Sequence, residues 1–523
     1  MAGVFTLPSD YWTSLRITPQ DIEYLHTYLF ERETPLTLSD LASAFVEFRI
    51  GLERAAAEKQ QKTAGRAFLP REKYQPGDEL IFPVFEWKPG KVTAVREGVN
   101  PSVGAFDVIA VTMEDGSQHM FAASLPLHPL NEAPAPAPES NECSPEFILH
   151  AHGAEIVKKL EMAFQADTGL VRIAGRWFPR SLLVDVNVGH LNLAEAALDV
   201  AAGDPQPTSN LLKDVALPEG VNPKLAEFSL NLALQEDDRF DEVGPAGEVL
   251  WSLRRLEPDY VRNVPAWLQY LSVEHERAVL NTEMLALEAQ LDDELSPIEA
   301  AELAGEASSI IISLIYPHLR SGTLPVSARA RKLFPTAYES PRVRFILVDG
   351  RTRQKMPAWV VLQHGYVYGL REWYKAHQLM PGSLVQIRRG ERPGEVIVEA
   401  KTQRAAKDWV RTLIVGADGG MVFAMLKQPI TAEFNDRMAI YVPDFKALDP
   451  LWEKKKPFGD LVTSVMHEMT KLNPQGHVHA QELYAAVNLV RRVPPAPLFA
   501  LLESKPTFKH VGDLHYRLVE ETE

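Results

Sequence analysis

The sequence predicts an α+β protein built from several domains. Its 523 residues exceed one typical domain, and segments with apolar residues at helical spacing alternate with short runs of strand-like, period-two pattern. A Pro/Ala/Glu-rich segment in the first third cannot bury apolar surface and is expected to be a linker. We therefore divide the chain into a helical part (1–70), a small β-barrel (75–130), the linker (131–144), a helical module ending in a hairpin (145–257), an acidic helical connector (258–316), a basic β-rich part (317–449) and a C-terminal helical module (450–523).

Composition limits the function classes. A hydrophobic content of 46 % with 24 % charged residues is typical of folded proteins. No apolar run reaches the roughly 18 residues that span a bilayer, and the N-terminus has neither a basic lead nor an apolar signal core. We therefore expect a cytoplasmic protein without a membrane partner. The single cysteine, Cys143, excludes an intramolecular disulfide and a cysteine-rich metal centre.

The first part shows two helical stripes, separated by a turn at TPLTLSDL. The stripes are formed by Ile22, Leu25 and Leu29 and then by Leu41, Phe45 and Phe48. Thr18 followed by Pro19 is a typical helix start. Helix, short turn and helix at this spacing resembles the opening of a winged helix, and a plain helical hairpin fits the pattern equally well.

From Gly77 the apolar period changes to two. DELIFP, GKVTAVRE, FDVIAVTM and QHMFAAS are short strands between Gly- and Pro-containing turns, and this spacing predicts a small SH3-like barrel. The opening YQPGDELIF is similar to small barrels of transcription-associated proteins, which begin with a Gly-Asp turn. Both a structural spacer and a binding module remain open.

Residues 145–257 begin with a helix and a strand pair that closes on a Gly-Arg-Trp turn. Three helices are then expected at Leu193–Ala201, Thr208–Val215 and Pro223–Glu236, followed by the hairpin RFDEVG and EVLWSL. Three helices that end in a two-stranded hairpin form the winged-helix arrangement.

This segment resembles the winged-helix module of the bacterial RNA polymerase delta subunit. The resemblance rests on the LAEAAL helix, on the short second helix entered at Pro207, and on the ending that contains Phe240 and Trp251. It implies that Phe240 and Trp251 pack the hairpin onto the helices. The hairpin carries the acidic sequence EDDRFDE, which argues against insertion into DNA and favours docking to a protein.

The same ending returns at the C-terminus. TFKHVG, which contains Phe508, aligns with RFDEVG, and helices are expected at Ala480–Val487 and Pro495–Leu502. We therefore infer a diverged internal repeat with two or three winged helices in the chain. This copy is the more basic one, and its candidate nucleic-acid contacts are Arg491, Arg492, Lys505 and Lys509.

The connector 258–316 is acidic, with Leu280, Met284, Leu287 and Leu291 at helical spacing. This stripe predicts an amphipathic helix that packs on its neighbours. An acidic arm that shields the basic part after it is the alternative.

The basic part stands out by charge. Residues 319–411 carry 18 Lys and Arg but only 7 Asp and Glu, a formal charge of +11, whereas the whole chain carries −16. Such a distribution indicates a polyanion partner bound locally, and an Arg-rich but merely solvated barrel exterior is the alternative. The candidate contacts are Arg329, Arg331, Lys332, Arg342, Arg344, Arg351, Arg353, Lys355, Arg371, Lys375, Arg388 and Arg389.

The order of elements in this part adds a second resemblance. The strands VRFILVDG, KMPAWVVLQ, SLVQIRR and EVIVEA surround the helical segment GLREWYKAHQLMPG. This order is similar to the plant-type DNA-binding pseudobarrel that some restriction enzymes use, in which two arms enter the major groove. The resemblance implies a first arm at Ser327, Arg329, Arg331 and Lys332, and a second loop at Arg351, Arg353 and Lys355. Trp373 and Tyr374 on the short helix are expected to fill the barrel.

Enzyme signatures are absent from the sequence. It holds no phosphate-binding GxxxxGK[ST], no GxGxxG after a strand, no HExxH and no GxSxG, and His477 and His479 lack a third ligand at metal-binding spacing. We expect a non-enzymatic, transcription-associated DNA-binding protein without a cofactor, with RNA polymerase or another protein as a second partner. A protein-interaction scaffold and the recognition component of a restriction or defence system are the alternatives, and DNA and RNA are not distinguished.

Overall fold

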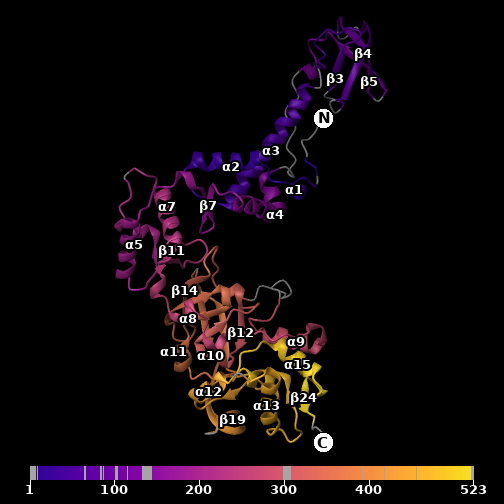
Figure 1. The fold of residues 1–523 in the computed structure, drawn as a ribbon. Coiled ribbons are helices and arrows are strands. Elements are labelled where there is room, and N and C mark those ends of the chain that lie inside the picture. Colours follow the sequence, from indigo (N-terminus) through magenta and orange to yellow (C-terminus); the bar gives the residue numbers. More distant parts are fainter. Residues whose placement is uncertain are drawn as a thin grey trace. The chain divides into compact units, whose positions relative to one another are not determined.

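The computed structural model describes residues 7–8, 10–63, 66–82, 85, 88–100, 104–114, 116–131, 144–218, 220–298, 308–392, 394–416, 419–454 and 456–519. Helices and separate β-sheets alternate along the chain, which confirms the α+β class (Figure 1). The contacts divide the chain into two bodies, the first containing residues up to Val184 together with Val221–Phe228, and the second the remainder. The expected linker lies outside the described residues except at its two ends.

The first body begins with a helical module. Asp21 accepts a hydrogen bond of 2.7 Å from the Thr18 backbone N–H and so caps the first long helix, as the Thr-Pro start predicts. The elements are α1 (Tyr11–Ser14), α2 (Pro19–Arg32), β1 (Leu36–Thr37), α3 (Leu38–Thr63), α4 (Pro145–Gln165), β7 (Leu170–Ile173) and β8 (Arg176–Pro179).

The grouping of these elements differs from the sequence expectation. The helix and strand pair at 145–184 were assigned to the module that follows, yet β8 pairs with β1, with Trp177 opposite Leu36, and α4 packs on α3. The reason is that β7 and β8 complete a three-stranded sheet with a strand more than a hundred residues earlier. The intervening small β-domain is therefore an insertion within this module.

The inserted domain is a five-stranded sheet in the order β2-β3-β4-β5-β6. Its strands are β2 (Arg66–Ala67), β3 (Glu79–Phe82), β4 (Lys88–Glu97), β5 (Asp107–Met113) and β6 (Gln118–Ala123), close to the predicted runs. A shift of register between Val92 and Ala94 interrupts the β4–β5 ladder, and β-bulges of this kind bend a strand. Phe68, Phe82 and Ile109 are among the residues that form its core.

The predicted three helices and hairpin follow, and they belong to the second body except for the start of α7, up to Phe228, which groups with the first. The elements are α5 (Val188–Val200), β9 (Gln206–Pro207), α6 (Thr208–Asp214), α7 (Pro223–Glu236), β10 (Phe240–Glu242) and β11 (Leu250–Leu253). Phe240 and Trp251 are buried against the helices, as the resemblance implies. Asn231 on α7 accepts hydrogen bonds from Trp251 Nε1 (2.8 Å) and Thr208 Oγ1 (2.5 Å), which ties the hairpin to two helices.

The basic part forms a mixed seven-stranded sheet in the order β12-β17-β18-β14-β15-β16-β13. The strands are β12 (Ser309–Ser313), β13 (Thr323–Pro325), β14 (Arg342–Asp349), β15 (Lys355–Val361), β16 (Tyr366–Tyr368), β17 (Leu384–Arg389) and β18 (Glu395–Ala400), with the helices α10 (Tyr316–Ser321) and α11 (Arg371–Ala376). Trp373 and Tyr374 of α11 lie in the core of this sheet, as expected.

The expected helical connector at 258–316 is wrong in most of its length. Within this segment the described residues form α8 (Asp259–Arg262), α9 (Thr282–Leu291), short 3₁₀ turns and the edge strand β12 at residues 309–313, and a further helix, α10, begins at Tyr316. The physical reason is that Ile310 and its neighbours pair with β17 and bury apolar area there. Met284 and Leu287 of α9 are buried against the C-terminal elements, as the helical stripe predicted.

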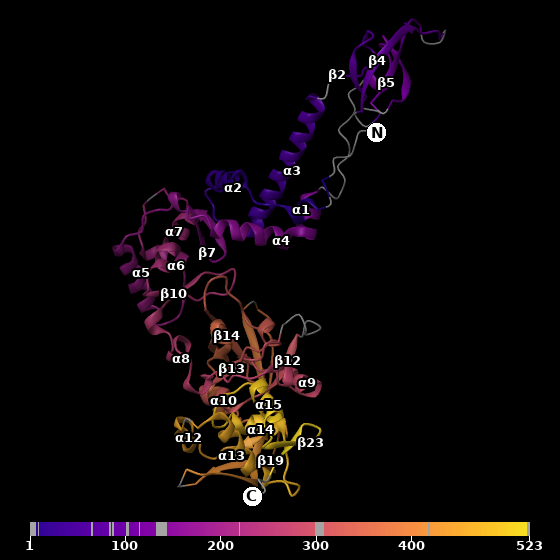
Figure 2. The same cartoon turned by 45° about the vertical axis from the view of Figure 1, so that its right-hand side comes forward.

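The C-terminal third combines a long hairpin with a helical module. It contains β19 (Thr402–Val415), β20 (Met421–Ala432), β21 (Ile440–Tyr441), α12 (Asp449–Glu453), α13 (Phe458–Thr470), β22 (Val478–His479), α14 (Ala480–Val487), α15 (Pro495–Ser504), β23 (Phe508–Gly512) and β24 (His515–Leu518). One core joins α9, the hairpin and α13–α15, and the yellow C-terminal helices lie next to the orange sheet in both views (Figures 1 and 2).

One order of elements occurs three times among the described residues. In each case the order is a helix, a short strand, two helices and two strands, interrupted in the first case by the inserted domain, and the short strand pairs antiparallel with the last strand, as β1–β8, β9–β11 and β22–β24. We call these the N-terminal module (α2–β8), the middle module (α5–β11) and the C-terminal module (α13–β24). Among the described residues no helix is long and apolar enough to cross a membrane.

Replacing Phe240 by Ala is expected to destabilise the middle module by about 3–5 kcal/mol, because the buried ring leaves a cavity. Urea unfolding of the full chain measures the loss. Phe147→Ala, which truncates a ring that is half exposed, is the matched control and should change stability by less than about 0.5 kcal/mol. Equal unfolding midpoints for the two variants would show that Phe240 is not a core residue.

Candidate nucleic-acid interface

Four basic side chains gather around one hollow in the second body. The hollow has a volume of about 770 Å³ and is lined by three segments, residues 331–336, the β17–β18 turn and the β10–β11 turn. Arg331 and Lys332 come from the first segment, and Arg389 and Arg392 from the second. We call this site the basic groove.

The first segment is held from both sides. Leu333 and Phe334 are buried in the core of the seven-stranded sheet, which leaves the preceding Arg331 and Lys332 exposed. Ser327 donates a hydrogen bond of 2.5 Å to Asp292, at the end of α9, and its carbonyl accepts from the Arg331 backbone N–H at 2.9 Å. These contacts fix the backbone from which the two basic side chains project.

Backbone contacts join the other two segments to the first. The Arg389 guanidinium donates to the Lys332 carbonyl at 2.7 Å, and the Ala246 N–H donates to the Thr336 carbonyl at 2.6 Å. The β17–β18 turn and the β10–β11 turn are therefore both attached to the segment that carries Arg331 and Lys332. Sequence reasoning missed the β10–β11 turn, because no local pattern links it to the basic part.

A neighbouring basic loop, between β14 and β15, is organised by Asp349. This carboxylate accepts hydrogen bonds from the backbone N–H groups of Arg351 (2.7 Å) and Thr352 (3.0 Å) and from Trp373 Nε1 (2.8 Å), and lies 2.9 Å from His377 Nε2. Burial alone would raise the pKa of Asp349, but these hydrogen bonds outweigh burial and lower the pKa to about 2. The ionised carboxylate therefore holds the loop that presents Arg351 and Arg353.

Acidic residues offset part of this charge. Lys355 pairs with Glu395 at 2.7 Å and Arg353 with Glu391 at 3.5 Å. Both cations are more than half exposed, and Glu391 is exposed as well, whereas Glu395 is only 15 % exposed. Within the described ranges the side chains of three other cations make no hydrogen bond or ion pair, namely Arg331, Lys332 and Arg392.

Two predicted contacts serve the interior instead. Arg342 pairs with Glu257 at 2.6 Å and with Asp241 at 3.1 Å, and Arg344 lies over the Trp359 ring, 5.4 Å from its centroid. Burial lowers the pKa of Arg344. Arg342 connects β14 to the middle module, and Arg344 packs on the sheet. We therefore correct the assignment of both residues to the nucleic-acid interface.

The remaining predicted contacts lie outside the groove. Arg329 donates to the Ala289 carbonyl at the end of α9 (2.8 Å), and Arg371 stacks over Tyr260 at 5.3 Å. Lys375 pairs with Glu372 on the same helix. Arg388 is half-buried on β17, Arg491 stacks over Phe458, and Lys505 and Lys509 are exposed in the C-terminal module.

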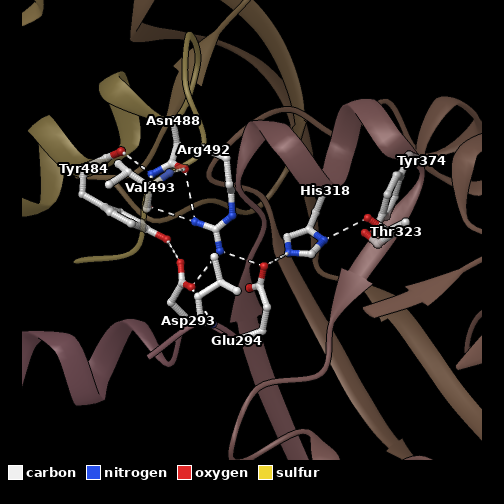
Figure 3. A network of polar contacts seen from close by, with 10 residues as sticks. Asp293, Glu294, His318, Thr323, Tyr374, Tyr484, Asn488, Arg492 and Val493 are labelled. Carbon is white, nitrogen blue, oxygen red and sulfur yellow. Dashed lines mark hydrogen bonds and ion pairs between the residues drawn. The ribbon is translucent and has the colours of Figure 1, made fainter. Parts of the chain in front are cut away.

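Arg492 is also corrected, because it is fully buried. Its guanidinium donates to Asp293 and Glu294, both at 2.7 Å, and to the Val493 carbonyl at 2.9 Å (Figure 3). Burial would raise the pKa of Glu294, but the charges of Arg492 and His318 outweigh burial and hold this pKa well below its ordinary value. Arg492 is therefore a structural cation that nucleic acid cannot reach.

The network continues from Arg492 into the seven-stranded sheet. His318 Nε2 on α10 lies 3.1 Å from Glu294, and its Nδ1 lies 2.9 Å from the Thr323 hydroxyl on β13. On the other side Tyr484 of α14 donates to Asp293 (Figure 3). Buried charges are thus shared by the C-terminal module, the segment after α9 and the sheet.

The two histidines considered as metal ligands contact other groups, and His477 Nε2 lies 2.5 Å from the Gln475 side-chain oxygen. His479 Nδ1 accepts a hydrogen bond from the Gln481 N–H and caps α14, while its Nε2 lies 2.9 Å from Arg437. Burial, aided by Arg437, lowers the pKa of His479 to about 4. In the described part of the chain no group of three or more His, Cys, Asp or Glu side chains could hold a metal ion.

Comparison of the chain with protein-family models, with curated proteins and with solved structures found no match.

Replacing Arg492 by Met should destabilise the second body by about 3–5 kcal/mol, because two buried carboxylates lose their cation. Urea unfolding of the full chain checks this. Arg491→Met is the matched control, since that partly exposed guanidinium has only a 3.4 Å contact to the Lys456 carbonyl and a ring stack, and should cost less than about 1 kcal/mol.

Adding Asp293→Asn and Glu294→Gln to Arg492→Met should recover part of the loss, because the unpaired charges are removed. If the Arg492→Met variant lost no more stability than the Arg491→Met control, a structural role for the ion pairs of Arg492 with Asp293 and Glu294 would be contradicted.

Proposed function

We propose that the chain is a non-enzymatic DNA-binding protein that holds the DNA backbone in the basic groove. The observation that carries this proposal is the convergence of Arg331, Lys332, Arg389 and Arg392 from two segments that are separated in the sequence. Phosphates are bound by clustered Lys and Arg, and Arg additionally offers paired N–H donors that match phosphate and guanine.

The charge distribution supports a local site. The chain outside residues 319–411 sums to −27, so long-range attraction of a polyanion to the chain as a whole is weak. Within the described ranges the side chains of Arg331, Lys332 and Arg392 form no hydrogen bond or ion pair. A phosphate can therefore bind these three cations without breaking such a contact.

The groove consists of turns fixed on a rigid sheet. Both the β17–β18 turn and residues 331–336 are tied to the sheet core and to one another. Binding residues placed in this way lose little conformational freedom when the ligand binds. Arg331 and Lys332 belong to the first arm that the resemblance to the DNA-binding pseudobarrel implies, whereas Ser327 and Arg329 of that arm contact Asp292 and Ala289.

We interpret the three repeated modules as winged helices. Their order of helices and strands and the pairing of the short strand with the last strand agree with that fold. The acidic hairpin of the middle module is partly neutralised internally, because Arg239 pairs with Asp237 (2.8 Å) and Glu195 (2.7 Å). We propose that this module positions its turn beside the groove, and that the other modules bind DNA or dock a transcription protein such as RNA polymerase.

Reversing the charges of Arg331 and Lys332, as Arg331→Glu with Lys332→Glu, should weaken duplex binding. The slope of log affinity against log salt should fall by about two, because two phosphate contacts no longer release counterions. Fluorescence anisotropy of a labelled duplex with the full chain at several salt concentrations measures both quantities.

Arg71→Glu with Lys73→Glu is the matched control, since it reverses two exposed charges on the inserted domain and should leave the affinity and the slope unchanged. An unchanged slope in the groove variant would exclude the groove as the site. If the unaltered chain does not bind duplex at low salt, DNA binding is wrong and a protein-interaction scaffold takes its place.

A further inference from the structure

The hairpin β19–β20 carries an exposed tryptophan that the fold leaves uncovered. Trp409 is 61 % exposed, on a stretch of β19 where residues 404–407 are exposed as well. The partner stretch of β20, residues 425–427, is also exposed. An aromatic ring of this size normally contributes its area to a core or to an interface, so the exposure needs an explanation.

The hairpin is anchored on both sides of this stretch. Leu413 and Phe423 lie in the core of the C-terminal module, and Ala432 lies in the core of the seven-stranded sheet. Beneath the stretch, Val410 and Ile430 pack with Met380 and Ala439. The backbone under Trp409 is therefore held at its two ends and from below, and the ring is presented from a fixed support.

The exposed face is basic as well as aromatic. Trp409 lies directly opposite Lys427, and Lys407 lies opposite Pro429, two residues away on the same face. Lys427 Nζ lies 5.4 Å from the Trp409 ring centroid. Arg404 is also exposed on β19, within the register shift between Thr402 and Ala406.

Acidic residues do not neutralise this face. Asp408 alternates to the opposite face of the strand, where its carboxylate accepts from Gln403 at 3.2 Å. Arg404 and Lys407 make no ion pair among the residues that the structure describes. The strip formed by Lys407, Trp409 and Lys427 is thus an exposed aromatic ring with two lysines on the same face, one of which, Lys427, lies over the ring.

We propose that this strip binds a single-stranded segment of nucleic acid, with an unpaired base stacked on Trp409 and its flanking phosphates on Lys407 and Lys427. The inference rests on the proposed nucleic-acid function and specifies its ligand as a duplex with an adjoining single strand. Aromatic rings beside cations bind single strands because each base has a face that can stack. A base inside a duplex has both faces covered, so the ring selects unpaired bases.

The alternative occupant is a protein with an apolar patch. The cations on both sides of the ring favour a polyanion, because they would be buried without a partner under an apolar surface. An acidic protein surface would also neutralise the two lysines. A site built for such a protein, however, would bind a duplex with a single-stranded tail no better than a blunt duplex. This difference makes the two occupants separable by experiment.

The test compares two labelled ligands with the full chain, a blunt duplex and the same duplex with a single-stranded tail of about ten nucleotides. The tail should increase the affinity of the unaltered chain. Trp409→Ala should remove roughly 5- to 150-fold of this gain while the affinity for the blunt duplex stays unchanged. Trp409→Phe should keep most of the gain, because a smaller ring still stacks.

Phe30→Ala is the matched control, since that ring is 59 % exposed and lies in the first body. The control should keep the full gain from the tail. Lys407→Glu with Lys427→Glu provides a second variant, which should lose the tail-dependent gain without altering the core. A full gain in both the Trp409→Ala and the lysine variants would overturn the inference.

Two further outcomes separate this inference from the proposed function. Binding of both ligands with equal affinity by the unaltered chain would overturn the single-strand site and leave the basic groove in place. Binding of neither ligand at low salt would overturn the proposed function itself.

Discussion

The second body depends on a buried ion pair between Arg492 and the carboxylates of Asp293 and Glu294. All three side chains are nearly or fully excluded from solvent, and their contacts join the C-terminal module to the segment that follows α9. The same segment contains Asp292, which receives the hydrogen bond from Ser327. One short acidic run therefore supports both the C-terminal module and the backbone that precedes Arg331. Loss of its cation would leave charges that the interior cannot solvate.

The fold determines which Lys and Arg side chains are structural and which are exposed at the surface, because it places buried carboxylates beside some of them and not beside others. Arg342 and Arg492 meet buried carboxylates and hold separate elements together, whereas Arg331 and Lys332 meet none within the described residues. Basic residues of the second body thus either form buried ion pairs or stay exposed to solvent. A basic stretch with a net charge of +11 is consistent with both roles, and only the spatial arrangement separates them. The unpartnered cations are the ones that a polyanion can use at little cost.

Local sequence patterns predicted most helices and strands. They did not predict which distant elements pair with one another. Period-two runs located β14, β15, β17 and β18, because alternation and turn residues act over a few positions. The pairing of β1 with β8 joins segments separated by the inserted domain, so the N-terminal module was divided wrongly. Arg491 and Arg492 look alike in the sequence, yet Asp293, which pairs with Arg492, lies 199 residues away. Of the four cations in the basic groove, the sequence singled out Arg331, Lys332 and Arg389 as candidate contacts. No local sequence pattern predicts that the β10–β11 turn lies beside them.

Hydrogen exchange of the full chain, with and without a bound duplex at low salt, tests the central claim most directly. We expect slower exchange on DNA binding in residues 328–336, 388–392 and 394–396, whose backbones carry or flank the four cations of the basic groove. We expect little change around Arg492, which is already buried. A bound duplex that protects neither segment, and protects only the helical modules, would contradict the account.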